Sequence, residues 1–469
     1  MIGLSVYAAI AGGLFIALWK YPAVALAGVL CMFGLEQWGQ ATTTFFLQHH
    51  TATNYLIGGI LVLALTVEGV KKGLSFLAGY PSVGWLTLGL FLYAFASAQW
   101  APRSDISLDL WASRWPYVIT FIVLSPLLIT QTRDLQAANI GMLVFGGFLT
   151  ILLLFFVEWE HRRIVLGHEF GNPLAVSTMA AMVVFTAVLA DPWPESRWWV
   201  PIKWALVALC LALIVRSGSR GQLLGVIAIS AVCWPISRRI ENLKQFLGWV
   251  CLLIFLSGIT IWSLQRFWAE RETYYAGGSR WSDQAMEGAM SGRFDNAILL
   301  VQHCYQSVET IIFGLGNSAS FDPRILGIYP HFVPLEILAE EGLIGFALFG
   351  LVLYSTARNA FKCYSQLNAT PVNRKIFAAL LAVFLFTLLL SLKQGSLLGN
   401  LEPFMFAIIL GKHSKIFLER QVVADRPQSP ILAQAGKAWP LLPHTIRSTH
   451  NKRSRASSST FPTGNQSHV

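Results

Sequence analysis

Long apolar runs separated by short polar connections make up most of the chain. Most runs approach the roughly 20 residues that a helix needs to cross a bilayer, and the period-2 alternation of membrane β-strands is absent. The pattern predicts an all-α, polytopic membrane protein with about 12 to 13 transmembrane helices. The expected spans are 2–19, 22–36, 53–70, 81–98, 116–130, 138–157, 172–190, 202–215, 219–236, 246–263, 333–355, 376–391 and 396–411.

Charged residues are scarce and unevenly placed. They make up 12% of the chain, against about 25% in soluble domains. The connections rich in Lys and Arg fall on one side of the expected topology, which we take as cytoplasmic. The segment from Lys412 onward carries nine Lys/Arg against two acids, a balance of +7 within a net charge of +10. We therefore expect a transmembrane domain over 1–411 and a basic, disordered cytoplasmic tail over 412–469.

The remaining connections are expected to be external, and the side of the N-terminus stays open. The longest external connection, 264–332, contains an amphipathic stretch, Arg293–Glu309, that favours helices packed on the membrane. The expected partner of the basic tail is the lipid bilayer rather than nucleic acid, because no folded basic module accompanies it.

The first candidate site lies around Arg216 and Arg220, which flank Ser217-Gly218-Ser219 at the external end of a span. The two arginines are four residues apart and would share a face if one helix held both. They could simply reach toward lipid headgroups. Alternatively they form a phosphate clamp, in which guanidinium groups and free N–H groups at a helix start bind the oxygens. Gly221 would then allow a close approach to the backbone.

The second candidate is His331, which precedes a helical segment carrying Glu336 and Glu340 on one face. Imidazole titrates near neutrality, so His331 can take a proton from an attacking hydroxyl. The alternative for His331 is an ordinary interfacial residue. The alternative for the acids is that they cap or solvate the outer turns of the span.

Further external residues could contact a ligand. Arg293 is a candidate cation, although it could pair with Asp295 on the surface. Gly316 and Asn317 lie in a turn where the backbone could approach a ligand. A polar external cluster contains His161-Arg162-Arg163 and Asn172; it could bind sugar or phosphate, or only anchor the chain at the interface.

Metal-binding motifs are missing from the sequence. There is no Walker loop, no HExxH and no Asp-x-Asp pair in an external loop, and a metal-dependent transferase needs such carboxylates. We expect no metal and no cofactor, so arginines would have to neutralise a diphosphate.

Four short motifs resemble those of the bacterial O-antigen ligase and O-antigen polymerase superfamily. They are Ser219-Arg220-Gly-Gln-Leu-Leu224, His331-Phe followed after nine residues by Gly342-x-x-Gly345, Gly314-Leu-Gly316, and Gly171-Asn172-Pro173. The resemblance covers about residues 165–411. One departure is Phe332, which stands where Ser or Asn is common, so one polar contact is missing.

This resemblance implies a GT-C-like, metal-independent glycosyltransferase in the inner membrane with its site facing the periplasm. Its donor would be a glycan on undecaprenyl diphosphate. Arg220 and Arg293 would hold the diphosphate, and His331 would activate or orient the acceptor hydroxyl. Residues expected to contact substrate are Arg216, Gly221, Gly316, Asn317, Asn172 and Glu340.

The acceptor stays open at this level. For an O-antigen ligase it is lipid A–core, and for a polymerase of O-antigen or exopolysaccharide it is another lipid-linked repeat. A transporter of lipid-linked glycans is the alternative from another class, and it would favour broken helices and charges within the bundle. A non-catalytic scaffold is the weakest alternative.

Overall fold

The computed structural model describes residues 2–73, 79–160, 162–167, 169–238, 242–272, 295–365 and 371–424. Contacts divide the chain into a compact unit, Met1–Glu419, and a second unit, Arg420–Val469. Of the second unit only the helical residues 420–424 are described. Arg293 and the tail beyond Ala424 therefore lie outside the described residues.

The compact unit is built almost entirely of helices, as the sequence predicts. Its α-helices are α1 Ile2–Lys20, α2 Ala25–Thr42, α3 Thr44–Gln48, α4 Ala52–Lys72, α5 Ser82–Ser97, α6 Ser104–Val118, α7 Ser125–Leu127, α8 Thr132–Gly141, α9 Gly147–Phe155, α10 Pro173–Phe185, α11 Trp199–Arg216, α12 Arg220–Ser237, α13 Leu243–Glu272, α15 Val308–Phe313, α16 Val333–Glu340, α17 Gly342–Ser365, α18 Pro371–Ser391 and α19 Glu402–Ala424. Short 3-10 or π segments are η1 Pro22–Val24, η3 Ile119–Leu124, η4 Met142–Gly146, η5 Thr186–Ala190, η6 Ala319–Phe321 and η8 Leu397–Gly399.

One small antiparallel sheet interrupts the helices between α9 and α10. Its strands β1 Trp159–Glu160, β2 Arg163–Leu166 and β3 Glu169–Phe170 pair in the order β1-β2-β3. The β1–β2 register pairs Glu160 with Arg163. The turn between these strands therefore has two residues, and Arg162 in it has a positive φ of 65°, as tight hairpin turns require.

Among the described residues, fewer helices are long and apolar enough to cross a membrane than the apolar pattern predicts. Eight described helices are long and apolar enough, and three shorter apolar helices lie over Tyr7–Lys20, Ser82–Ser97 and Leu243–Ile259. Two expected spans have other bounds in the structure. The run 116–130 falls largely within the continuous helical stretch formed by α6, η3 and α7, and the run 396–411 begins in η8 before α19 starts. The coarser conclusion, a multi-pass helical membrane protein, is supported by these helices.

The expected span 333–355 is broken in two, and the reason is local. Leu315 and Gly316 donate their N–H groups to the carbonyls of Ala339 and Glu340, at 2.9 and 2.8 Å, so the α16 carbonyls are used before a helix could continue. Gly342 then adopts a positive φ of 64°, which ends a helix at little steric cost only in glycine. Apolar periodicity carries no signal for this break.

Other boundaries also differ from expectation. Much of the expected loop 99–115 is α6, and α13 continues to Glu272, past the expected start of the long loop at 264. Within the expected amphipathic stretch Arg293–Glu309, the described residues are helical over 295–304, and α15 begins at Val308. Helix α19 continues past position 412. The Lys412 side chain within it is buried and donates to the Pro126 carbonyl at 3.0 Å.

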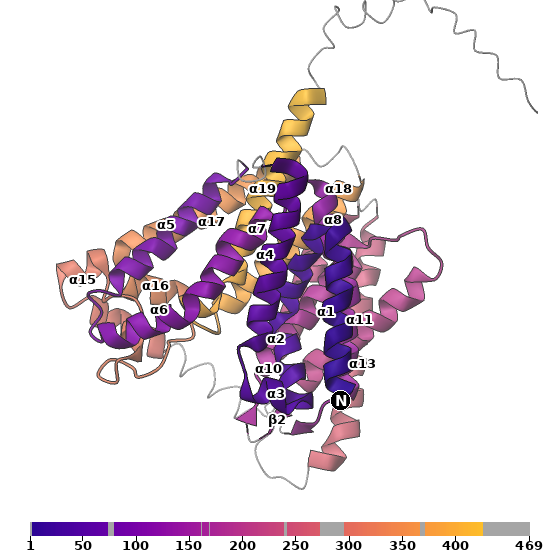
Figure 1. Cartoon of the computed structure of the whole chain (residues 1–469), viewed down its shortest axis with the longest axis horizontal. Coiled ribbons are helices and arrows are strands. Elements are labelled where there is room, and N and C mark those ends of the chain that lie inside the picture. The colour runs from indigo at the N-terminus through magenta and orange to yellow at the C-terminus, as the bar shows by residue number, and fades with distance from the viewer. Residues whose placement is uncertain are drawn as a thin grey trace, which may run out of the picture. The chain divides into compact units, whose positions relative to one another are not determined.

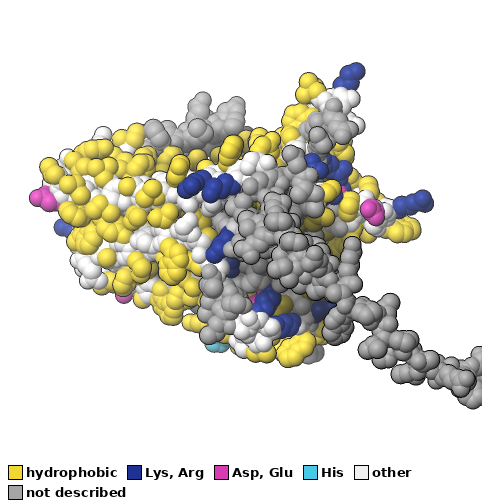
Figure 2. Space-filling model, turned by 90° about the horizontal axis from the view of Figure 1, so that it is seen from above, with side chains coloured by type: hydrophobic (Ala, Val, Ile, Leu, Met, Phe, Trp, Pro, Cys, Tyr) yellow, Lys and Arg dark blue, Asp and Glu magenta, His cyan; other side chains and the backbone are white. Residues whose placement is uncertain are grey.

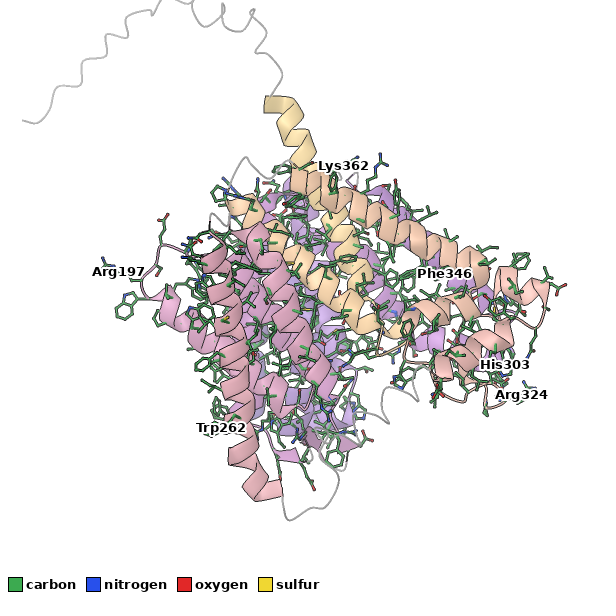
Figure 3. All side chains as sticks on the ribbon, turned by 180° about the vertical axis from the view of Figure 1, so that it is seen from behind. Arg197, Trp262, His303, Arg324, Phe346 and Lys362 are labelled. Carbon is green, nitrogen blue, oxygen red and sulfur yellow. The ribbon has the colours of Figure 1, made fainter. Side chains whose placement is uncertain are left out.

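Helices α1, α2, α4, α10 and α11 stand side by side, whereas α5 and α17 lean away from them as a pair (Figure 1). Lys362 lies near one end of α17, and His303 and Arg324 lie beyond its other end, close to α15 and α16 (Figure 3). Hydrophobic side chains cover much of the described surface on the face that Figure 2 shows; Ile16, Val70 and Trp85 are 77%, 83% and 65% exposed. Such exposure suits lipid contact, because soluble monomers rarely expose large apolar patches.

Candidate functional site

The turn between α11 and α12 carries the first motif. Gly218 has a φ of 67°, and the Ser219 N–H closes the turn on the Ile214 carbonyl at 3.3 Å. The buried Ser217 hydroxyl donates to the Ser219 hydroxyl at 2.9 Å. Arg216 therefore ends one helix and Arg220 begins the next, and they do not share a helical face as they would in one continuous helix.

The two arginines lie in different surroundings. The Arg216 guanidinium donates to the carbonyl of Leu154 at the end of α9, and it lies over the Trp159 ring at 5.1 Å from the ring centre. Arg216 thus ties α11 to α9 and the small sheet. Arg220, half-buried in the first turn of α12, lies close enough to Arg162 of the β1–β2 turn for their charges to repel each other.

A third cation, Lys393, lies at the same helix start. It belongs to the connection between α18 and α19, and its side chain lies directly against Gly221. A Cβ built at Gly221 would collide with the Lys393 ammonium and would come within 2.8 Å of its Cε. The adjacent residues are also joined, because Gln222 donates to the Gln394 side chain at 3.1 Å. Gly221 therefore gives room to a lysine of this chain.

The sequence analysis missed Lys393. A signal was present, because a lysine in a short connection on the expected external side departs from the positive-inside trend. Its proximity to Gly221 depends on the packing of α12 along α18, which the sequence does not reveal.

The same connection is joined to the histidine motif. A carboxylate oxygen of Glu336 in α16 accepts from the Leu397 N–H at 3.1 Å. Asn400 closes the connection on itself by donating to the carbonyls of Gln394 and Ser396, at 2.8 and 3.1 Å. One compact connection, residues 392–401, thus contacts both the start of α12 and the helix that His331 precedes.

His331 is half-buried in a strained backbone conformation just before α16. Its φ is 63°, which is uncommon for a residue other than glycine. Its ring lies 4.2 Å from the Tyr329 ring, centre to centre. Such strain persists where the surroundings fix a conformation, and it clusters at functional sites.

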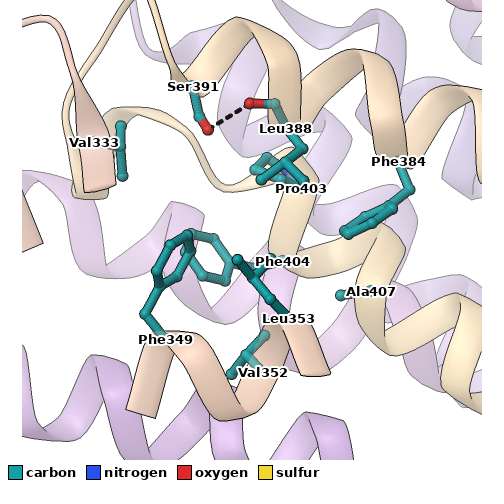
Figure 4. A pocket seen from close by; sticks show the side chains of 10 residues that line it. All are labelled: Val333, Phe349, Val352, Leu353, Phe384, Leu388, Ser391, Pro403, Phe404 and Ala407. Atoms are coloured by element: carbon teal, nitrogen blue, oxygen red, sulfur yellow. Dashed lines mark hydrogen bonds between the residues drawn. The ribbon is translucent and has the colours of Figure 1, made fainter. Parts of the chain in front are cut away.

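An apolar crevice opens beside this region (Figure 4). Its volume is about 10 Å³, room for roughly one water molecule. Its lining starts at Val333, two residues after His331, and reaches Ser391, two residues before Lys393. Ser391 turns its hydroxyl to the Leu388 carbonyl of its own helix at 2.7 Å. The other lining residues, all apolar, are Phe349, Val352, Leu353, Phe384, Leu388, Pro403, Phe404 and Ala407.

Asn317 lies in a buried polar network. Its side chain accepts from the Trp111 indole at 2.9 Å and donates to Glu341 at 2.7 Å. Its N–H donates to the Ser97 hydroxyl at 2.9 Å, and its carbonyl accepts from Ser107 at 2.8 Å. Asn317, which we expected from the sequence to contact substrate, is 1% exposed. Its hydrogen bonds join the α5–α6 region to α16.

Glu340 and Gly316 belong to the same network. The buried Glu340 carboxylate accepts from the N–H groups of Ser318 and Ser320, at 2.6 and 2.9 Å. Gly316 has a φ of 94°, and a Cβ built there would lie 2.5 Å from the Ala101 Cα. The backbone at Gly316 therefore lies close to another segment of this chain, where the sequence predicted a close approach to a ligand. Burial raises the pKa of Glu340, and burial with the neighbouring Glu340 raises the pKa of Glu341 to about 8.

Asn172 serves as the N-cap of α10. Its side-chain oxygen accepts from the Leu174 N–H at 3.0 Å, and its carbonyl accepts from Gln37 at 3.0 Å. Asn and Pro at these positions are favoured at helix starts for this reason, so the Asn-Pro pair has a structural use.

The described site therefore brings Arg162, Arg220 and Lys393 to the N-terminal end of α12, with the His331 helix held by the same connection. Converging cations at the positive end of a helix dipole favour a bound anion. Arg216, Asn317, Glu340 and Asn172 are engaged elsewhere by the contacts within this chain given above. No family model matches this chain, and no curated protein matches it.

Proposed function

We propose that this protein is a glycosyltransferase that moves a saccharide from undecaprenyl diphosphate to an acceptor hydroxyl at the periplasmic face of the inner membrane. The observation that carries the proposal is the connection 392–401. It brings Lys393 against Gly221 beside Arg220, and it holds the helix preceded by His331.

The cations would act on the leaving group. As the acceptor oxygen attacks the anomeric carbon, the bond from that carbon to the diphosphate oxygen breaks, and negative charge grows on the diphosphate. Arg220 and Lys393, with Arg162 nearby, would stabilise that charge in the transition state. Diphosphate is a good leaving group, so an arginine and lysine clamp is chemically sufficient.

His331 would serve the acceptor. The acceptor hydroxyl loses its proton to the imidazole as the new glycosidic bond forms, and the proton then passes to the departing diphosphate or to water. The strained backbone at His331 supports this role, because it points to a conformation maintained for a purpose other than packing.

The apolar crevice of Figure 4 marks the path that we propose for the polyprenyl chain of the donor. It starts between the His331 and Lys393 segments, and its side chains are apolar except for Ser391. A lipid diphosphate bound there would place its charged group at the cations and its isoprene units between α17, α18 and α19. Because the crevice has a volume of only about 10 Å³, this path requires α17, α18 and α19 to separate when the lipid binds.

The leading acceptor is lipid A–core, as for an O-antigen ligase, and a lipid-linked repeat is the alternative. The test uses purified protein, an undecaprenyl-diphosphate-linked glycan and each acceptor in turn. Transfer to lipid A–core, lost in Arg220→Ala but kept in Arg324→Gln, is the expected result. Arg324 is the matched control because its side chain is 74% exposed and paired with Asp322.

Each other outcome has a definite meaning. Growth of the lipid-linked repeat, again lost with Arg220→Ala, identifies a polymerase using the same site. Equal transfer by Arg220→Ala and wild type contradicts the anion clamp. If the folded protein transfers the glycan to neither acceptor but moves the lipid-linked glycan across vesicle membranes, the protein is a transporter.

A further inference from the structure

A second charged cluster lies at the other end of α12. Its centre is Asp191, which follows η5 and is 1% exposed. The carboxylate lies 3.1 Å from the Lys203 ammonium, 2.7 Å from the Arg238 guanidinium and 3.6 Å from the Lys375 ammonium. The Trp199 indole donates to it at 2.9 Å. Segments far apart in the sequence meet here on one carboxylate.

The cluster has more positive charge than its acid offsets. Three cations against one carboxylate leave two positive charges. Arg374, next to Lys375 in the sequence, lies in the first turn of α18, where the helix dipole is also positive. Among the described residues, the buried Nε atoms of Arg238 and Arg374 have no hydrogen-bond partner. A buried donor of this kind is costly to leave unsatisfied.

Three tryptophan rings lie next to the cluster. The Arg238 guanidinium lies 5.0 Å from the Trp234 ring centre, and Trp234 lies 4.9 Å from Trp249. Trp249 in turn stacks on Trp204 at 5.4 Å. Tryptophan is enriched at the level of lipid headgroups, which supports a position of these rings and cations at the depth of the lipid phosphates.

The neighbouring surface is apolar. Trp198 and Ile202, at the start of α11, are 80% and 55% exposed. A molecule bound at the cations would thus extend beside exposed apolar side chains. Figure 2, which looks onto the end of the molecule near the start of α18, shows Lys and Arg gathered on this face with few acids.

We propose that this cluster binds the phosphate headgroup of an anionic phospholipid. Arg238 and Lys375 contact the phosphate, Asp191 keeps the cations converged, and the acyl chains lie along the exposed start of α11. A basic pocket between transmembrane helices is a known arrangement for anionic headgroups. This end carries the connections whose Lys/Arg content predicts a cytoplasmic location. The site is separate from the proposed transferase site.

The test measures lipid binding to the full chain in detergent by native mass spectrometry and by thermal unfolding. Phosphatidylglycerol and phosphatidylcholine with identical acyl chains are compared, with inorganic phosphate as a third arm. We expect phosphatidylglycerol alone to bind and to raise the unfolding temperature. Arg238→Gln and Lys375→Gln should each weaken its binding about fivefold, the contribution of one cation near an anionic headgroup.

Arg358→Gln is the matched control. Arg358 is an exposed cation in the C-terminal half of α17, the half that leads to the start of α18. It should leave lipid binding unchanged. Equal binding of both lipids, or full phosphatidylglycerol binding in both cation variants, overturns the proposal. An equal effect of inorganic phosphate overturns the lipid assignment in favour of a free anion.

Discussion

Adding one methyl group at Gly221 tests the contact on which the candidate site depends. In Gly221→Ala, the new Cβ overlaps the Lys393 ammonium and comes within 2.8 and 3.1 Å of its Cε and Cδ, well inside the 3.5–4.0 Å of ordinary carbon contacts. The obstructing atoms are the far end of a flexible side chain, so Lys393 moves and the backbone stays. Alanine also favours the helix by ~0.5–1 kcal/mol over glycine.

The expected result is a protein at least as stable as wild type with slower glycosyl transfer. Losing one positioned charge at a developing oxyanion costs about 10²-fold, or ~2.7 kcal/mol. Because Lys393 is displaced rather than removed, we expect a loss between about 10-fold and 100-fold in kcat. The assay is single-turnover transfer from the lipid-linked donor at saturating concentration, run beside denaturant unfolding.

The double variant makes the reasoning sharper. If Gly221→Ala acts through Lys393, then Gly221→Ala combined with Lys393→Gln should be no slower than Lys393→Gln alone. Gly350→Ala in α17 is the control for helix propensity, because a Cβ there meets nothing within 4 Å. Wild-type kcat in Gly221→Ala, or losses that multiply in the double variant, would refute the role given to Lys393.

Three further outcomes follow from the buried network and the histidine. Asn317→Ala should lower the free energy of unfolding by ~2–4 kcal/mol, because Trp111 and Glu341 each lose a buried partner; a change below ~1 kcal/mol in chemical denaturation would contradict this. The free energy of unfolding should fall as the pH rises from about 5 to 9. The pKa of Glu341 in the folded state is raised to about 8, so this carboxyl stabilises the fold fully below its unfolded pKa. The stabilisation is lost as the pH rises through the folded pKa and the carboxyl ionises. Thermal unfolding across this range checks the sign, and Glu341→Gln should flatten the slope. His331→Gln should slow transfer about 10²- to 10⁴-fold with KM for the donor unchanged; a raised KM with normal kcat would make His331 a binding residue.

The helical membrane class was predictable because it depends on composition and run length alone. Eight long apolar helices match expected spans in place, although their ends differ. The break at Gly342 was not predictable from periodicity. It arises because Leu315 and Gly316, far away in the sequence, take the last carbonyls of α16.

The candidate site was predictable in its motifs and not in its contacts. Arg220 and His331 stand out by residue type and position, but their common link is a short connection whose importance appears only when α12 packs along α18. Asn317 and Glu340 look like ligand residues in the sequence, since polar groups beside an apolar span suggest function. In the structure their hydrogen bonds hold the 314–321 segment against α16.

The central claim is that cations at the start of α12 bind the donor diphosphate while His331 acts on the acceptor. Binding of undecaprenyl diphosphate and single-turnover transfer, measured together on Arg220→Gln, Lys393→Gln and His331→Gln, separate these roles. We expect the two cation variants to bind the lipid diphosphate at least about tenfold more weakly, and the histidine variant to bind it normally but transfer little. Normal binding by both cation variants, with folded protein, would contradict the claim.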